Sequence, residues 1–451
     1  MCGSGDRRRP PNGEKLISRA DPENDAQVPG TASEARRGLT ITALIIAGES
    51  VFLLPFVLPR IFRPTLLEVF GLTNLDLGAA FFVYGIVAMA AYFLGGPLAD
   101  RFPARVLLAL ALASTAAGGL VLMRIPSLQT LIVLYAYWGV TTVALFWAPL
   151  IRATRQWGGE DSQGRAFGLL EGGRGLLAAA IGAVMVAVFS GLLPAASETA
   201  SVAQRTAAMQ QVVLLLSVVT CSAAVLVWLA LPRAGADEKR DEEQLSLRGI
   251  AHVFSMPAVW LQALIILCAY VGFKAIDDFS LYAYEVIGLN QVEAAQAGVL
   301  SLWMRPIAAV GAGYLADRFG APAMTIGAFC VVALGGAVLA SGLLGFGMVW
   351  IFLLTVICSS MGIFALRGLY YAIMRDGKVP LAYTGSAVGF VSFIGYTPDV
   401  FMGPLMGYLL DSSPGAAGHQ HVFWVVSAFA LFGIAASLMF VRVTRGAKHP
   451  A

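Results

Sequence analysis

The chain has 451 residues, of which 58% are hydrophobic and only 13% are charged, and its formal net charge is +3. Soluble globular proteins carry about 25% charged residues, so this composition excludes an ordinary soluble fold. A charge of +3 over this length is not the basic footprint of a nucleic-acid-binding protein, and no nucleic-acid partner is expected. The five cysteines form no Cys-x-x-Cys pair, which argues against a disulfide framework or a zinc site. We therefore expect a membrane protein.

The chain opens with about 38 polar residues, a composition typical of a disordered tail. Twelve apolar stretches follow, each long enough to cross a bilayer core about 30 Å thick. They lie at about residues 40–59, 77–97, 104–123, 128–151, 165–193, 209–232, 256–287, 293–314, 321–343, 348–374, 381–410 and 420–443.

A polar segment at residues 233–252, with the charged run Asp237–Glu243, divides these stretches six and six and predicts a solvated linker. The expected fold is an all-α membrane protein with 12 transmembrane helices. Its domains would be the tail at 1–38, six-helix bundles at 39–232 and 253–445, and a short tail at 446–451.

The distribution of basic residues predicts the orientation of the chain. All but four of the basic residues outside the apolar stretches fall on the side that carries both termini; the exceptions are Arg60, Arg63, Arg124 and Arg205. Because Lys and Arg accumulate in cytoplasmic loops, we expect both termini in the cytoplasm.

An internal repeat links the two halves of the chain. The sequence Leu-Ala-Asp-Arg-Phe at residues 98–102 recurs at residues 315–319, a shift of 217 residues, at the end of the second stretch of each half. Two homologous six-helix halves are a known plan of membrane transporters.

At this loop the chain resembles the major facilitator superfamily, over residues 39–445. The family signature Gly-x-x-x-Asp-Arg-x-Gly-Arg-Arg/Lys appears as residues 96–105 and again as residues 313–322. The first copy has Pro103 and Ala104 in place of a glycine and a base, and the second lacks the trailing bases. The resemblance implies that the signature latches the cytoplasmic side shut in the outward-facing state, through Asp100, Arg101, Asp317 and Arg318. Both aspartates are expected at the start of the next helix, where a carboxylate can cap amide donors.

The stretch from Trp147 to Arg174 is similar to the branch of the family that moves organophosphates and other organic anions. The most similar members are poorly characterised bacterial proteins associated with sugar or sulfosugar uptake, which implies the inner membrane as location. Organophosphate antiporters carry paired arginines on their first and seventh helices. Here Glu49 and Lys274 occupy those helices, which argues against a divalent phosphate substrate.

Charged residues inside the apolar stretches are candidate site residues, because each costs about 2.5–3.5 kcal/mol at the centre of a span. Asp277 and Asp278 follow Lys274 at i+3 and i+4, on one helical face. Lys274 could bind an anion while one aspartate carries a proton; a static ion pair is the alternative. Glu49 has no local partner, so it could couple protons, form a salt bridge across a cavity, or serve as a structural acid.

Two arginines and one acid of the second half complete this group. The planar guanidinium groups of Arg305 and Arg367 suit bidentate recognition of a carboxylate, phosphate or sulfonate; fixed pairs with Glu171 or Asp399 are the alternative. Asp399 follows Pro398 in a glycine-rich run that predicts a bent helix, and it could be a coupling acid or a structural partner.

The remaining candidate residues have either a structural interpretation or two interpretations between which the sequence does not decide. Glu171 and Arg174, one turn apart, are expected to pair with each other or to form an inner gate. Aromatic residues could shape a cavity or only pack: Tyr270, Trp147 and Tyr396, and also Tyr84, Tyr282 and Trp303. His419 and His421 are expected to be an exposed pair in the last outer loop, with no metal.

The sequence contains no GxxxxGK[ST], HExxH or GxSxG motif, so neither ATP-driven transport nor enzymatic activity is expected, and no cofactor. We expect a monomeric secondary transporter that imports a small organic anion with protons. Lys274, Arg305 and Arg367 would contact the anion, and Glu49 and Asp277 would couple protons. Proton-driven drug efflux, anion exchange and a transporter-like receptor are the alternatives.

Overall fold

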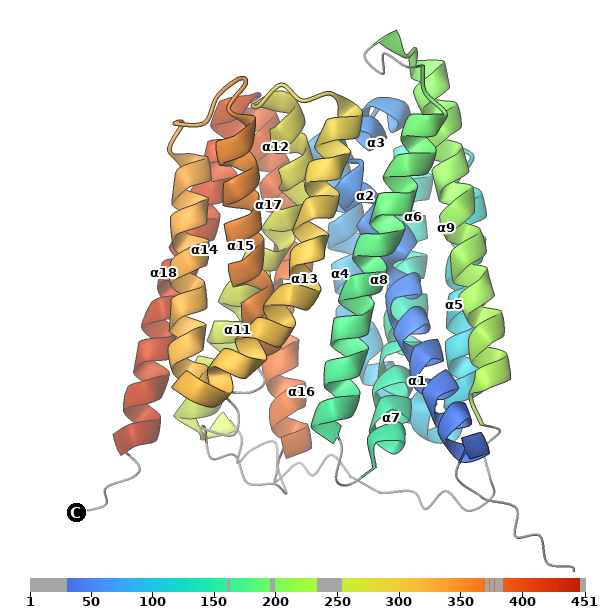
Figure 1. Cartoon of the computed structure of the whole chain (residues 1–451), viewed down its shortest axis with the longest axis vertical. Helices are drawn as coiled ribbons and strands as arrows, with labels where there is room; N and C mark the ends of the chain where they lie inside the picture. Colours follow the sequence, from blue (N-terminus) through green and yellow to red (C-terminus); the bar gives the residue numbers. More distant parts are fainter. Residues whose placement is uncertain are drawn as a thin grey trace, which may run out of the picture.

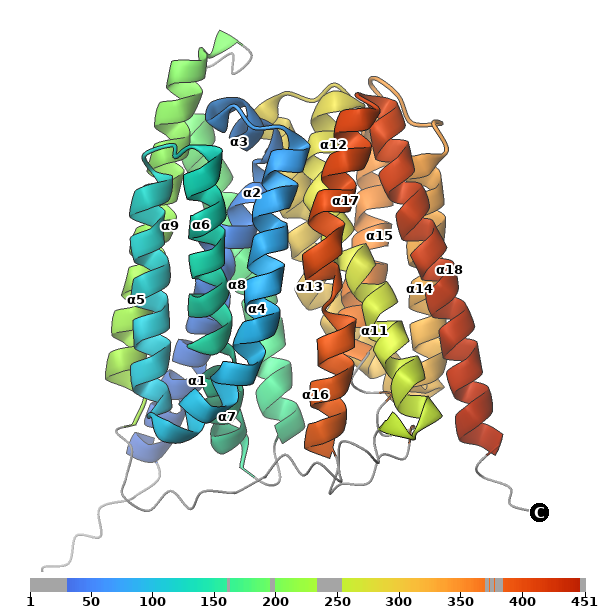
Figure 2. The same ribbon diagram turned by 180° about the vertical axis from the view of Figure 1, so that it is seen from behind.

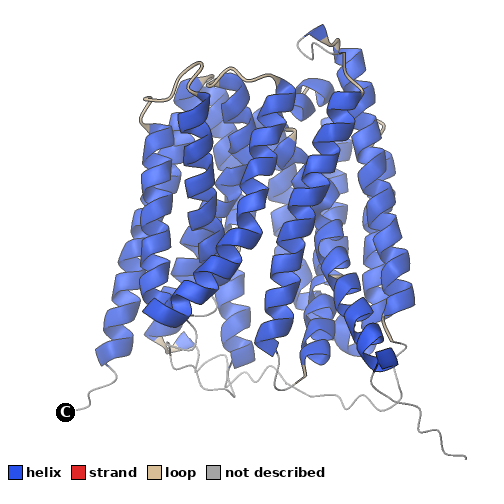
Figure 3. Ribbon diagram, viewed as in Figure 1, coloured by secondary structure: helices blue, strands red, loops and turns tan. Residues whose placement is uncertain are grey.

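The computed structural model describes residues 31–159, 163–194, 199–232, 254–369, 373, 377 and 384–446. Among these residues every long regular element is a helix (Figure 3). The helices form one bundle in which α1 begins and α18 ends at the same end (Figure 1). We call this the termini end and the opposite end, where α3 lies, the far end.

The N-terminal half runs from α1 to α9. Its helices are α1 (Thr31–Phe52), α2 (Leu58–Ile61), α3 (Arg63–Phe70), α4 (Asn74–Arg101), α5 (Ala104–Leu122), α6 (Leu128–Gly139), α7 (Trp147–Gly158), α8 (Gln163–Gly191) and α9 (Val202–Ala230). A π-helical turn at Leu53–Val57 joins α1 to α2, and a second at Val140–Ala144 leads from α6 towards α7. Helix α1 begins at Thr31 rather than at residue 39.

The C-terminal half runs from α11 to α18. Its helices are α11 (Pro257–Ala275), α12 (Phe279–Glu285), α13 (Gln291–Phe319), α14 (Ala321–Ala340), α15 (Val349–Leu369), α16 (Thr384–Gly395), α17 (Pro398–Ser412) and α18 (Ala416–Gly446). A 3₁₀ turn at Ile276–Asp278 joins α11 to α12. The predicted linker 233–252 lies outside the described residues, as do residues 1–30 and 447–451.

Eleven helical stretches in the described part of the chain are long and apolar enough to cross a membrane. They match eleven of the twelve stretches that the sequence predicts. The remaining one, 381–410, is divided into α16 and α17, which follow one another along the bundle (Figure 2). Pro398 begins α17 and has no amide hydrogen to donate, so a regular helix does not continue through this position.

The two halves meet along the helix pairs α4–α17 and α8–α13. The repeat shift of 217 residues places α4 on α13 and α8 on α16 and α17, so the two contacts are related by the internal repeat. Glycines bring α4 and α17 into backbone contact. A Cβ on Gly78 would overlap the carbonyl oxygen of Gly403, and one on Gly85 would lie 2.5 Å from that of Asp399.

Polar contacts tie the halves together at the far end. The carboxylate of Asp411, at the end of α17, accepts hydrogen bonds from the backbone amides of Asn74 (3.2 Å) and Leu75 (2.7 Å) at the start of α4. Gln291, at the start of α13, donates to Glu68 of α3 at 2.6 Å. The far end is therefore closed by contacts between the halves.

Candidate functional site

A cavity of about 110 Å³ lies between the two halves and is lined by residues of both. Two of its charged residues lie near the middle of their membrane-crossing stretches: Glu49 in Arg36–Ile61, and Arg305 in Gln291–Phe319. The charged side chains that line it are Glu49, Arg60, Arg174, Lys274, Arg305, Arg367 and Asp399. The sequence-predicted anion ligands Lys274, Arg305 and Arg367 thus share one cavity.

Irregular helix turns shape this cavity. Phe56 and Val57 come from the first π-helical turn, and Thr142 and Val143 come from the second. Tyr396 comes from the break between α16 and α17. Such turns leave backbone groups out of the regular ladder and occur frequently at functional sites.

The first group of charges, the Glu49 cluster, consists of Glu49, Glu171, Arg174 and Arg305. Glu49 Oε2 lies 3.3 Å from Nε of Arg174 and 3.2 Å from Nη1 of Arg305. Glu171 pairs with the same two arginines, at 2.5 Å and 3.2 Å. Arg305 belongs to the C-terminal half and the other three to the N-terminal half, so the salt bridge across the cavity that the sequence offered for Glu49 is present.

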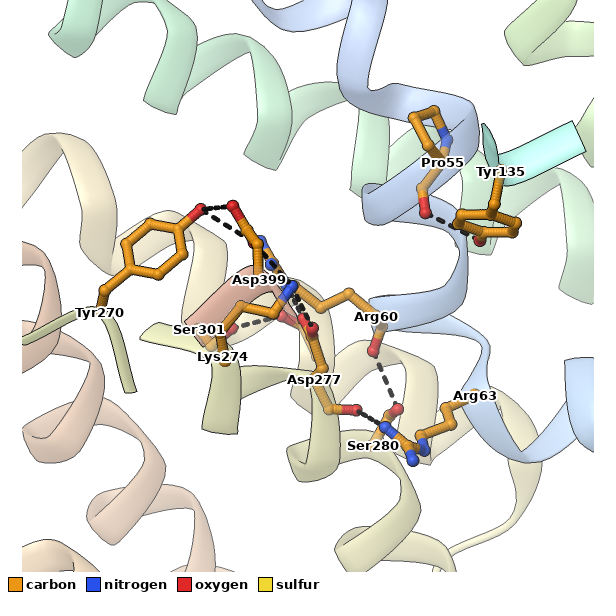
Figure 4. Close-up of polar contacts among 11 residues, drawn as sticks. Pro55, Arg60, Arg63, Tyr135, Tyr270, Lys274, Asp277, Ser280, Ser301 and Asp399 are labelled. Carbon is orange, nitrogen blue, oxygen red and sulfur yellow. Dashed lines mark hydrogen bonds and ion pairs between the residues drawn. The ribbon is translucent and has the colours of Figure 1, made fainter. Parts of the chain in front are cut away.

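The second group, the Lys274 cluster, consists of Arg60, Lys274, Asp277 and Asp399 (Figure 4). Lys274 Nζ lies 3.3 Å from Asp399 Oδ1 and 3.8 Å from Asp277 Oδ2. Arg60 of α2 donates to Asp277 at 2.6 Å, and the hydroxyl of Tyr270 donates to Asp399 at 3.1 Å. This cluster takes its arginine from the N-terminal half and its other three members from the C-terminal half.

The formal charges around the cavity are unequal. Five basic and two acidic side chains line it, and Glu171 and Asp277, which pair with these bases, bring the acids to four. Arg367 lies on this wall with its guanidinium 3.9 Å from the ring centroid of Phe273. Basic side chains thus predominate among the described residues that line the cavity, which suits an anionic ligand.

Aromatic rings complete the wall. Trp147, Tyr270, Tyr396 and Tyr84 line the cavity, as the sequence suggested. The guanidinium of Arg174 lies 5.7 Å from the Trp147 ring. Tyr282 and Trp303 do not line it: the Tyr282 ring stacks on Phe352 at 5.4 Å.

Asp278 does not lie beside Lys274, contrary to the prediction of one shared helical face. Its Oδ2 lies 2.7 Å from Nδ1 of His419, because the 3₁₀ turn at Ile276–Asp278 departs from α-helical spacing. His419 is fully buried, so its predicted exposure is wrong; His421 is exposed. Among the described residues no group of three His, Cys, Asp or Glu side chains is placed to hold a metal ion.

The signature residues lie at the termini end, away from the cavity. Asp100 and Asp317 belong to the last turns of α4 and α13, and the N-cap residues of the next helices are Pro103 and Gly320. Their predicted position at the start of the next helix is therefore wrong. The guanidinium groups of Arg101 and Arg318 lie 5.9 Å and 5.4 Å from the rings of the phenylalanines that follow them. The side chain of Asp100 is not described.

Two residues that line the cavity were not predicted from the sequence to do so. Arg60 was assigned to an outer loop and Arg174 to a gate, yet both line the cavity. The internal repeat contains a signal for Arg60, since the shift of 217 residues places it on Asp277, its partner. The same shift places Phe56 on Phe273, and both rings line the cavity.

Comparison with known proteins agrees with this arrangement. Residues 39–398 match the model of the Major Facilitator Superfamily. The chain is 24% identical over 434 residues to the inner membrane protein YqcE of Escherichia coli K12, covering 92% of this chain and 97% of that protein. It is 24% identical over 410 residues to the inner membrane protein YihN of the same organism, covering 88% and 94%.

Two solved transporter structures have a similar fold. A mutant of the nucleoside transporter NupG gives a TM-score of 0.68 at 12% identity, over 90% of this chain and 99% of that one. A bacterial homologue of the human lysosomal transporter Spinster, in an inward-facing and unoccupied conformation, gives a TM-score of 0.67 at 14% identity, over 91% and 98%.

Proposed function

Since the chain belongs to the Major Facilitator Superfamily, we propose that it imports a small organic anion together with protons by alternating access. The family and the transporter folds that it resembles make the chain a secondary transporter rather than an enzyme. Its relatives are named inner membrane proteins, and it crosses that membrane many times.

The observation that carries the anion proposal is the predominance of basic side chains among the described residues that line the cavity. Five bases line it against two acids, and two further acids pair with those bases. Guanidinium forks bind carboxylate, sulfonate and phosphate groups with two parallel hydrogen bonds, and four of the five bases are arginines: Arg60, Arg174, Arg305 and Arg367.

The small volume and the charged lining of the cavity favour this substrate over an amphipathic drug. Pockets for drug-sized ligands usually measure about 300–1,000 Å³ and have only a few polar groups. This cavity measures about 110 Å³ and seven charged residues line it. A compact polar solute fits these walls better than a large hydrophobic one.

Proton coupling is supported by the pairing of the acids with the same bases. Asp399 and Asp277 pair with Lys274, and Glu49 pairs with Arg174 and Arg305. An anion that binds these bases competes with the carboxylates. A displaced carboxylate would be an unpaired charge in a buried site, and accepting a proton removes that free-energy cost. Asp277 and Asp399 are therefore the proposed coupling acids, and neither Glu49, which holds two arginines at once, nor Asp278 is needed for this step.

We also propose that both termini are cytoplasmic and that the carrier acts as a monomer. The far end, where Asp411 and Gln291 tie the halves together, then faces outward. The signature residues Asp100, Arg101, Asp317 and Arg318 would close the termini end in the outward-facing state.

The test is uptake into proteoliposomes of two labelled probes, gluconate and methanesulfonate. An inward proton gradient should accelerate uptake of at least one probe by the wild-type protein, and Lys274→Ala should reduce that uptake about tenfold or more, since it removes a buried charge contact. Uptake that ignores the gradient would contradict proton coupling, and a requirement for internal anion would indicate exchange. Export of hydrophobic compounds by both proteins, with no anion uptake, would indicate drug efflux.

A further inference from the structure

Glu171 binds the two arginines of its cluster in the manner of an anionic ligand. Its Oε1 lies 2.5 Å from Nη1 of Arg174, and its Oε2 lies 3.2 Å from Nη2 of Arg305. One carboxylate thus places one oxygen on each guanidinium. The two arginines come from α8 and α13, that is, from opposite halves.

Glu49 contacts the same arginines in a different way. It uses the single oxygen Oε2 for both, at 3.3 Å and 3.2 Å. Its side chain is 4% exposed, whereas that of Glu171 is 44% exposed. Removing a buried carboxylate from its pair leaves uncompensated buried charge. A half-exposed carboxylate can instead turn to water, provided that another anion takes over its buried guanidinium partners.

Glu49 and Glu171 therefore have different roles in this cluster. Glu49, which lines the cavity and is itself almost fully buried, holds the guanidinium groups of Arg174 and Arg305 together. Glu171 is partly exposed, so its carboxylate can leave the two arginines when another anion replaces it. When it leaves, the two guanidinium groups present the separated donors that its two oxygens had occupied.

We propose that Glu171 occupies the place of the substrate's anionic group in the empty carrier, and that the substrate binds by displacing it from Arg174 and Arg305. This inference rests on the proposed anion transport and specifies its geometry. The four side chains of the Glu49 cluster have a formal charge of zero. Exchange of one carboxylate for one monoanion preserves that balance, so the fitting ligand carries a single carboxylate or sulfonate rather than a doubly charged phosphate ester.

The displacement also explains how the empty carrier keeps its halves in contact. Without a ligand, Glu171 of α8 ties Arg305 of α13 to the N-terminal half. With a ligand, the anion takes over the same bridge between Arg174 and Arg305. The substrate thus replaces one contact between the halves by an equivalent one.

The test measures binding of gluconate and of methanesulfonate to the purified full-length protein, as thermal stabilisation at constant ionic strength. Glu171→Asp keeps the charge but shortens the side chain by one methylene, so it can no longer bridge both arginines; Glu171→Gln removes the charge. Both variants should bind at least one probe up to about fivefold more tightly than the wild type, since they remove a competitor held by a partly exposed ion pair.

Glu49→Asp is the matched control, because it makes the same shortening in the other carboxylate of the cluster. It should bind neither probe more tightly and should lower the melting temperature. Tightening in Glu171→Gln alone would assign the effect to charge and overturn the displacement. Equal or weaker binding in both Glu171 variants would overturn it as well, with anion binding intact. Failure of the wild type to bind either probe would instead contradict the proposed anion transport.

Discussion

The imidazole ring of His419 lies between two carboxylates. Its Nδ1 lies 2.7 Å from Asp278 Oδ2, and its Nε2 lies 3.2 Å from Glu285 Oε2. Asp278 is fully buried, and its Oδ1 accepts no hydrogen bond from any described residue. A buried carboxylate needs a partner, so His419 ties α18 to the turn that precedes α12.

We predict that His419→Ala destabilises the folded protein by about 3 kcal/mol, because it leaves Asp278 buried without its partner. His421→Ala, at an exposed position two residues away, should change the stability by no more than about 0.5 kcal/mol. Melting temperatures of the two purified variants measure the difference. Equal melting temperatures would show that Asp278 does not depend on His419.

Residue spacing predicted part of this site. The Lys274–Asp277 pair follows from positions i and i+3 of one helix, and the structure contains it. The partner of Asp278 was missed because a 3₁₀ turn replaces α-helix at that point. The partners of Glu49 lie on α8 and α13, at sequence distances that no local pattern spans. Ion pairs between residues close in sequence can be predicted from their spacing, whereas ion pairs between the two halves can be identified only once the fold is known.

At the scale of the helices, irregular turns and breaks determine where the cavity lies. The bend near Asp399 was predicted from Pro398 and the glycines around it, and α16 and α17 are separate helices there. The π-helical turns were not predicted, because the stretches that contain Pro55 and Thr142 are as apolar as a continuous span. Apolar length finds the spans, but it does not reveal irregular turns within them.

Close packing of α4 on α17 should be sensitive to a single methyl group. Gly78→Ala places a Cβ against the carbonyl oxygen of Gly403, so the helices must separate, at a cost of about 1–3 kcal/mol. We predict a lower melting temperature and slower transport, since the far end closes less tightly.

Gly311→Ala is the control for this substitution. Gly311 lies in α13 with no atom within 4 Å of an added Cβ, and alanine favours a helix by up to about 1 kcal/mol over glycine. This variant should therefore keep or raise the melting temperature. If Gly78→Ala matches it in stability and transport, the contact between α4 and α17 does not govern closure.

At the scale of the whole molecule, each half contributes an arginine to an ion-pair cluster of the other half. Arg305 of the C-terminal half completes the Glu49 cluster, and Arg60 of the N-terminal half completes the Lys274 cluster. Rocking of the halves must therefore break or replace ion pairs at both clusters. An anion bound between them can replace the lost carboxylate contacts, which links substrate binding to movement.

Binding of a small organic anion in the cavity is the central claim, and thermal stabilisation of the purified protein measures it most directly. Gluconate or methanesulfonate should raise the melting temperature of the wild type, and Arg367→Ala should lose most of that rise because it removes one guanidinium from the cavity wall. A hydrophobic cation should give no rise. Stabilisation by the cation alone, or equal stabilisation of the wild type and Arg367→Ala by the anion, would contradict the proposed site.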